Sequence, residues 1–184
     1  GIGKIVEGYN SVISALENNR VLEIIALEKN LDSKKVKDLI KIAQQKKVEV
    51  KNIKSKNEWE FTSTEYVAAI CVPKTIYSES DLKKFDETNF IVCDHIQDTN
   101  NLGAIARSAA SFDFNVMCVP ERRSARLSER TFKISSGGLE KVDILEYKSI
   151  FSLIKKFQSL NVWTIGLDMD LSLIHISEPT RPFH

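Results

Sequence analysis

Residues 90–120 read FIVCDHIQDTNNLGAIARSAASFDFNVMCVP, and this stretch decides the fold of the chain. Its first four residues, Phe90 to Cys93, form a short apolar run of the kind found in buried strands. A polar segment follows, and apolar side chains then recur at helical spacing from Leu102 to Phe112. Residues 115–119 restore the strand pattern. The stretch therefore predicts a strand–loop–helix–strand unit whose loop follows the carboxyl end of a strand, where open α/β sheets bind ligands.

The start of the predicted helix carries the pattern Asn101-x-Gly103-x-x-x-Arg107. Gly103 allows a close backbone approach, and Arg107 lies one helical turn later, so its guanidinium can return toward the loop. An amide, a helix amino terminus and a guanidinium together suit a phosphate or a developing oxyanion. A helix cap, a turn glycine and a surface arginine would show the same spacing, so spacing alone leaves both interpretations open.

Two consecutive segments resemble SpoU-type (TrmH-like) RNA ribose methyltransferases of the SPOUT superfamily. They are DHIQDTNNLGAIARSAASFDFNVMCVP, which is similar to the family's first motif, and VPERRSARLSERTFKISSGGLEKV, which is similar to the segment after it. The amino-terminal third resembles the family's substrate-binding domain. The resemblance implies an α/β protein with an L30e-like, ribosomal-protein-like sandwich followed by a SPOUT domain. It also implies methylation of a ribose 2′-hydroxyl by S-adenosylmethionine, most simply on a guanosine of large-subunit ribosomal RNA, by a homodimer.

The resemblance assigns roles to particular residues. Arg107 would be the family's catalytic arginine, which stabilises the developing alkoxide or engages the adjacent phosphate, and Asn101 would position that arginine or the loop. Gly166, Leu167 and Asp168 end a predicted strand that borders the S-adenosylmethionine pocket in the family, so they are expected to contact the cofactor. The sequence shows no cluster with metal-ligand spacing, and no metal is expected.

The predicted organisation has four parts. Residues 1–73 would form the RNA substrate-binding domain, the polar residues 74–89 a linker that lets the domains reorient, and residues 90–170 an incomplete SPOUT domain. Residues 171–184 depart from the family, and 171–181 resemble the in-frame translation of a sequencing-library adapter. Because the family's knot-forming motifs that bind the methyl donor are not recognised, the chain as given is expected to be inactive.

The candidate RNA-contacting residues fall in two regions. Tyr9 and Asn10 are predicted just before a helix and Arg20 just after it, so an aromatic ring and a cation could hold an unpaired base. Packing of Tyr9 on the helix and solvation of Arg20 explain the same residues equally well. Thr64 lies in a polar loop where the family presents groups to RNA. The remaining candidates form the most concentrated basic patch of the chain, which suits either a phosphate backbone or a solvated helix: Arg122, Arg123, Arg126 and Arg130.

Composition narrows the remaining possibilities. The chain of 184 residues has 26 basic and 25 acidic residues, a net charge of +1, so RNA affinity must come from local patches. Cys71, Cys93 and Cys118 lie in apolar, strand-like runs and are expected to be buried thiols of a reducing compartment. No apolar run approaches membrane-spanning length, so a cytoplasmic protein is expected. A non-catalytic RNA-binding protein and a tRNA methyltransferase are the alternative functions. The turn at residues 135–138 is expected either to cradle a phosphate or simply to close a helix.

Overall fold

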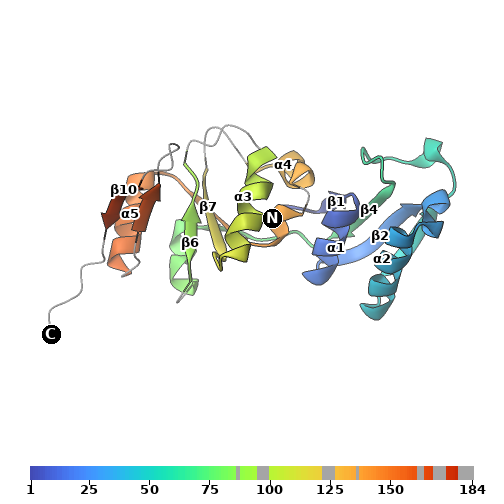
Figure 1. Ribbon diagram of the computed structural model, residues 1–184, viewed down its shortest axis with the longest axis horizontal. Coiled ribbons are helices and arrows are strands. Elements are labelled where there is room, and N and C mark those ends of the chain that lie inside the picture. The colour runs from blue at the N-terminus through green and yellow to red at the C-terminus, as the bar shows by residue number, and fades with distance from the viewer. Residues whose placement is uncertain are drawn as a thin grey trace.

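The computed structural model describes residues 1–85, 88–94, 100–121, 127–135, 137–160, 164–167 and 173–177. Within these residues the strands form two four-stranded sheets and one separate two-stranded sheet (Figure 1). The fold is α/β, as the sequence predicts.

The first sheet has the order β1-β4-β2-β3. The strands β2 and β3 are parallel, whereas β4 pairs antiparallel with both β1 and β2. The helix α2 joins the parallel pair, and the Ser33 hydroxyl accepts a hydrogen bond from the Val36 amide at 3.3 Å to cap it. The elements are β1 (Ile5–Glu7), α1 (Tyr9–Glu17), β2 (Val21–Leu27), η1 (Glu28–Asp32), α2 (Lys34–Gln45), β3 (Glu49–Ile53), η2 (Lys56–Glu58) and β4 (Val67–Cys71).

The second sheet is entirely parallel and has the order β5-β8-β7-β6. Its elements are β5 (Ile76–Ser78), η3 (Glu79–Lys84), β6 (Phe90–Val92), α3 (Asn100–Ser111), β7 (Val116–Pro120), α4 (Glu129–Ile134), η4 (Gly138–Glu140), β8 (Asp143–Tyr147) and α5 (Ile150–Ser159). The unit β6-α3-β7 is the predicted strand–loop–helix–strand, and α3 buries Leu102 and Ala106 as expected. Phe112 is an exception. It follows the last residue of α3 and is 74% exposed.

Part of the segment predicted as a linker, residues 74–89, belongs to the second sheet. The strand β5 pairs in parallel with β8, and the helix η3 follows it directly. Leu82 is buried against the second sheet. The rings of Tyr77 and Phe85 contact edge to face, with 4.9 Å between their centroids. These few apolar contacts therefore hold the segment against the second sheet, although its alternating charges are typical of a linker.

One apolar core runs through both parts of the molecule. It contains Val12 and Leu16 of α1 and Ile24 of β2, and it also contains Leu102 of α3 and Leu139 of η4. Because separating the two sheets would expose this surface to water, the core opposes the predicted reorientation of the two domains.

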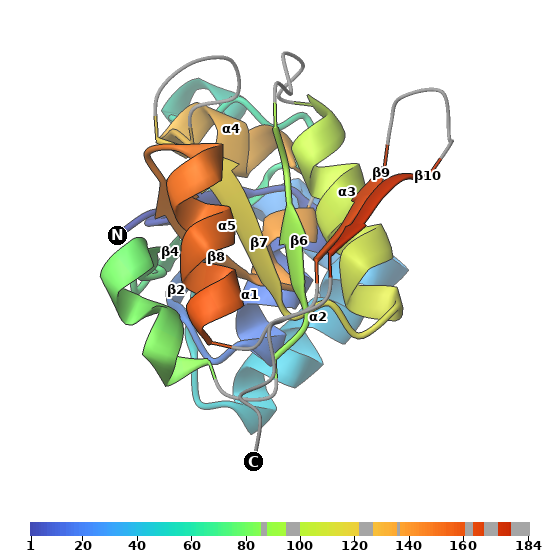
Figure 2. The same ribbon diagram turned by 90° about the vertical axis from the view of Figure 1, so that its left-hand side faces the viewer.

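The strands β9 (Thr164–Leu167) and β10 (Leu173–Ser177) form an antiparallel pair. The pair, drawn in red in Figures 1 and 2, lies at the end of the molecule away from the first sheet. The predicted strand near residue 165 is present, but within the described residues its partner is β10 and not the parallel sheet. The proposed bounds of the domains and the foreign origin of residues 171–184 stay predictions.

Candidate active site and RNA-facing surface

The parallel strands β6, β7 and β8 end at one edge of the second sheet, and a buried tyrosine ties these ends together. The Tyr147 hydroxyl donates to the Cys93 carbonyl oxygen at 2.7 Å, and the Tyr147 carbonyl accepts from the Glu121 amide at 2.8 Å. Burial, with a further contribution from Asp94, raises the pKa of the Tyr147 phenol well above its usual range. The hydroxyl therefore remains a donor. The sequence analysis did not identify Tyr147. The one feature that could have indicated its role is a ring with a hydroxyl group at the end of a strand.

The two predicted catalytic residues lie on α3, the helix that follows β6. Asn101 lies in its first turn, and both Asn101 and Arg107 are exposed. Six residues of helix separate them by about 9 Å along the axis and about 120° around it, and the Arg107 side chain leans toward the amino terminus of the helix. Among the described residues no hydrogen bond joins the two, and neither lines the cavities found there. Their joint role stays a prediction.

Gly103 brings α3 into backbone contact with the turn before η4. A Cβ on Gly103 would lie 2.8 Å from the Cα of Ser135, and a Cβ on Gly138 would lie 2.7 Å from the Cα of Gly103. These separations are too short for non-bonded carbon atoms, so only glycine fits at either position. The close approach predicted for Gly103 is therefore one between two protein backbones.

The glycine turn itself is buried and supports the helix-closing alternative over a phosphate cradle. Ser135 is buried, and its hydroxyl donates to the Phe132 carbonyl oxygen at 2.6 Å. Gly137 has a φ of +83°, and a Cβ there would lie 2.8 Å from the Ser14 hydroxyl of α1. The turn thus packs between α1 and α3, and it links the first sheet's helix to the helix with the catalytic candidates. Ser136 lies outside the described residues.

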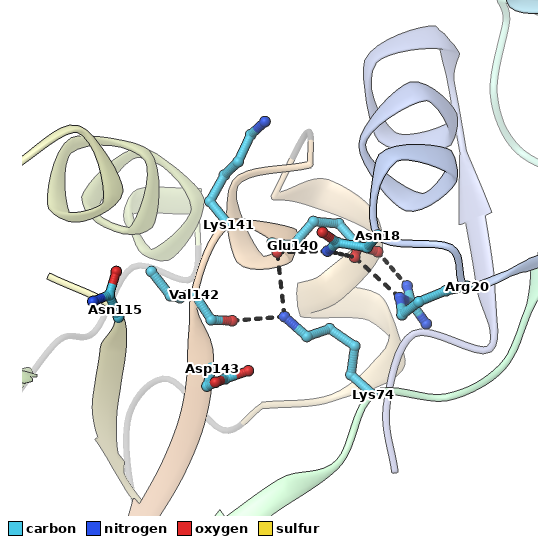
Figure 3. A pocket seen from close by; sticks show the side chains of 8 residues that line it. All are labelled: Asn18, Arg20, Lys74, Asn115, Glu140, Lys141, Val142 and Asp143. Atoms are coloured by element: carbon cyan, nitrogen blue, oxygen red, sulfur yellow. Dashed lines mark hydrogen bonds and ion pairs between the residues drawn. The ribbon is translucent and has the colours of Figure 1, made fainter. Parts of the chain in front are cut away.

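Arg20, one of the predicted RNA contacts, is buried, which argues against its direct contact with RNA. Its side chain is buried and forms an ion pair with Glu140 through two nitrogens (Figure 3). It also donates to the Gly3 carbonyl at 3.0 Å. The guanidinium also lies 5.4 Å from the centre of the Phe132 ring. The burial of Glu140, 120 residues away in sequence, explains why Arg20 is drawn inward.

Lys74 makes a second connection between the two sheets. Its ammonium donates to the carbonyl oxygen of Val142 at 2.6 Å (Figure 3). It also donates to the carbonyl oxygen of Leu139 at 3.0 Å, so it caps the end of η4. Burial lowers the pKa of this ammonium, although Glu140 and Asp143 oppose the shift. These groups border a cavity of about 410 Å³ whose lining is Asn18, Arg20, Lys74, Asn115, Glu140, Lys141, Val142 and Asp143. Arg20 and Glu140 of this lining pair with each other, and Lys74 bonds to backbone carbonyls, so these side chains join the two parts of the fold.

The other RNA candidates of the first sheet gather around the start of α1. The helix begins at Tyr9, so Tyr9 and Asn10 form its first turn instead of preceding it. Tyr9 is half-buried, with the Lys35 ammonium 5.6 Å from its ring centre, whereas Asn10 and Thr64 are exposed. The Tyr9 amide donates to the Glu65 carboxylate at 3.4 Å, so the loop with Thr64 touches the helix start. These three candidates are therefore brought together.

The basic patch is described only at its end. Arg130 is exposed on α4, and Arg122, Arg123 and Arg126 lie outside the described residues. Lys133, one turn after Arg130, pairs with the buried carboxylate of Glu7 at 3.1 Å. Burial opposes ionisation of Glu7, but hydrogen bonds from Lys133, Thr62 and Ser63 outweigh it and hold the pKa of this carboxyl below its usual range.

The predicted cofactor contacts are not assembled into a pocket by the described residues. Gly166 and Leu167 lie on β9 opposite His175 and Leu173 of β10, and Asp168 lies outside the described residues. Neither of the two described cavities includes them. Among the described residues no group of three or more His, Cys, Asp or Glu side chains could hold a metal ion, and no helix is long and apolar enough to cross a membrane.

The three cysteines are free and buried, as predicted. Burial raises the pKa of Cys71 to about 11 and that of Cys93 to about 12, and it raises the pKa of Cys118 still further. At pH 8 the thiolate fraction of Cys93 is then on the order of 0.01%. We expect none of the three to react with Ellman's reagent within minutes in the native protein, whereas the urea-unfolded chain should titrate three thiols. Rapid labelling of the native protein would contradict this burial.

Comparison with protein families gives two matches that together cover most of the chain. The model of the SpoU rRNA Methylase family matches residues 88–181. The model described as RNA 2′-O ribose methyltransferase substrate binding matches residues 5–62. The residues between the two matches, 63–87, contain β4 of the first sheet and β5 of the second.

Individual relatives are more distant. A putative TrmH family tRNA/rRNA methyltransferase of Bacillus subtilis is 23% identical, with 89% of this chain aligned to 68% of the relative. A 23S rRNA (guanosine-2′-O-)-methyltransferase of Xylella fastidiosa strain 9a5c is 25% identical over 89% of this chain and 69% of its own length.

Solved structures share the fold. The SpoU methyltransferase AviRb of Streptomyces viridochromogenes, solved with AdoMet, has a TM-score of 0.58 at 16% identity, covering 85% of this chain and 59% of that one. An AdoMet-bound rRNA methyltransferase of Sinorhizobium meliloti has a TM-score of 0.57 at 16% identity over 84% of this chain and 57% of its own. This chain thus spans less than three-fifths of the length of these solved structures.

Proposed function

Because the chain belongs to the SpoU rRNA methylase family, we propose that the protein methylates a ribose 2′-hydroxyl of RNA with S-adenosylmethionine as the methyl donor. One observation carries this proposal. Asn101 lies exposed in the first turn of α3, the helix that follows the carboxyl end of β6 in a parallel sheet of the family's fold, and Arg107 lies exposed further along the same helix. Ligands of open α/β sheets bind at this edge.

The preferred substrate is a guanosine of large-subunit ribosomal RNA. A relative named as a 23S rRNA (guanosine-2′-O-)-methyltransferase supports it, and the match of residues 5–62 to an RNA substrate-binding domain supports RNA as the partner. Relatives named as tRNA/rRNA methyltransferases keep tRNA as the second candidate. We further propose that the protein works as a homodimer, as the family resemblance implies, and that it works in the cytoplasm.

The chemistry requires a poor nucleophile to be activated. A ribose hydroxyl near neutral pH must share or lose its proton as it attacks. S-adenosylmethionine would supply the electrophilic methyl group. Arg107 would stabilise the developing alkoxide or hold the adjacent phosphate, and Asn101 would orient that arginine or the loop before it. Since Gly166 and Leu167 line neither described cavity, no donor contact is assigned to them beyond the family resemblance.

Arg107→Ala tests the proposal in the protein expressed from its complete gene. The variant should lower transfer of a labelled methyl group to unmodified large-subunit ribosomal RNA by about 10²- to 10³-fold, because the developing charge loses its positioned donor. Folding should be unaffected, since Arg107 is exposed. The matched control is Lys41→Ala, which removes an exposed cation from α2 and should leave turnover unchanged.

Retained turnover in Arg107→Ala would remove this residue from the mechanism. RNA binding by the wild-type protein without any transfer from the donor would instead favour the non-catalytic RNA-binding alternative. A filter-binding assay run with and without the donor, beside the transfer assay, separates these outcomes.

A further inference from the structure

The carboxylate of Glu7 connects two separate RNA candidates. Glu7 ends β1, and its side chain is only 5% exposed. It accepts hydrogen bonds from the Thr62 amide at 2.6 Å, the Thr62 hydroxyl at 2.9 Å and the Ser63 amide at 3.3 Å. On its other side it pairs with Lys133 of α4 at 3.1 Å. One buried carboxylate therefore holds a loop of the first sheet and a helix of the second part of the chain.

Each element held by Glu7 presents an exposed RNA candidate. The loop at residues 62–65 presents Thr64, and its Glu65 accepts a hydrogen bond from the Tyr9 amide. The helix α4 presents Arg130, which lies one turn before Lys133 and therefore on the same side of this helix. Thr64 and Arg130 are 66 residues apart in sequence. Thr64 lies within two residues of Thr62, which binds Glu7, and Arg130 lies one helical turn before Lys133, which also binds Glu7.

Lys133 differs from Arg130 in having its charge already neutralised. Its ammonium is paired with a carboxylate that three further hydrogen bonds keep ionised. A lysine engaged in this way is a poor phosphate ligand, because binding RNA would leave a buried carboxylate without its counter-charge. Of the two cations described on α4, Arg130 is the exposed one without a partner among the described residues, so it can bind phosphate.

We propose that Glu7 is a positioning residue for RNA binding, which fixes the loop at residues 62–65 and the helix α4 in one arrangement so that Thr64 and Arg130 contact the same RNA. The inference rests on the proposed function, because it assumes that RNA is the ligand of this surface. Glu7 itself and Lys133 do not touch the RNA.

The proposal predicts a change in RNA affinity opposite to the one that charge alone would produce. Removing a negative charge near a polyanion site strengthens binding. Loss of the Glu7 carboxylate should instead weaken it, because the loop and the helix are no longer held in register. We expect Glu7→Gln to bind unmodified large-subunit ribosomal RNA about three- to tenfold more weakly in a filter-binding assay at fixed salt.

Glu17→Gln is the matched control, because it makes the same change in charge at an exposed carboxylate that pairs with Lys141. It should leave RNA affinity unchanged or slightly increased. Thr62→Val is the second variant. It removes only one hydrogen bond to Glu7 and leaves the ion pair with Lys133, so it should shift affinity in the same direction by a smaller factor.

Two further measurements distinguish positioning from a general loss of stability. Amide hydrogen exchange of Thr62 and Ser63 should accelerate in Glu7→Gln, while that of Ala69 in the buried strand β4 should not change. The slope of log affinity against log salt should not become steeper, because Lys133 gains no phosphate contact.

Tighter binding by Glu7→Gln with a slope steeper by about one would show that Lys133 is a latent phosphate contact, and this would overturn the proposal. Equal affinity of Glu7→Gln, Thr62→Val and wild type would overturn it as well. If the wild-type protein binds no ribosomal RNA at all, the proposed function fails before the role of Glu7 is in question.

Discussion

Glu140→Ala is expected to lower the free energy of unfolding by about 3–5 kcal/mol, because it leaves the Arg20 guanidinium buried without its carboxylate. Arg20 would keep the carbonyl of Gly3 and the ring of Phe132, but neither carries a formal charge that neutralises it. Asn18, which donates to the same carboxylate at 2.8 Å, would lose that acceptor too. Urea unfolding followed by circular dichroism measures the change.

Glu17→Ala provides the comparison for this loss. Glu17 also pairs across the two parts of the chain, with Lys141 at 3.5 Å, but both of these side chains are about half exposed. Because solvent screens such a pair, its removal should change stability by no more than about 0.5 kcal/mol. Equal unfolding midpoints for Glu140→Ala and Glu17→Ala would mean that the buried pair does not hold the two sheets together.

The contrast between these two pairs shows where sequence reasoning succeeded and where it could not. Local patterns predicted β6, α3 and β7, because strand and helix periodicities appear within a short window of residues 90–120. The burial of the three thiols could also be predicted from the apolar residues around them in the sequence. Arg20 was assigned to RNA, since nothing near it in sequence reveals the buried Glu140 that it contacts.

The same lack of long-range information explains why residues 74–89 were predicted as a linker and why two roles were left open for the glycine turn. The strand β5 has only three residues, and its pairing with β8 spans more than sixty positions of sequence. The alternating charges after it gave the stronger local signal. At residues 135–138 two glycines fit a phosphate cradle and a packed turn equally well, until the backbone of Gly103 is known to lie against Gly138.

Gly138→Ala is expected to destabilise the protein by at least about 3 kcal/mol, because the added Cβ would lie 2.7 Å from the Cα of Gly103 and overlap its carbonyl group. Both opposing atoms belong to the backbone, so no side-chain rotation can relieve the overlap. Thermal unfolding of the variant beside Ser108→Ala measures this. Ser108 is exposed on α3, the helix that contains Gly103, and its replacement should cost no more than about 0.5 kcal/mol.

The overlap also bears on the catalytic candidates, because α3 must move away from the turn to accommodate the methyl group. Gly103→Ala would force the same separation from the other side, with its Cβ 2.8 Å from the Cα of Ser135. The double variant should therefore cost less than the sum of the two single changes. In any variant that still folds, Asn101 and Arg107 would shift with the helix and methyl transfer should fall. Additive stability losses, or full methyl transfer in a folded Gly138→Ala protein, would show that the glycine contact does not set the position of α3.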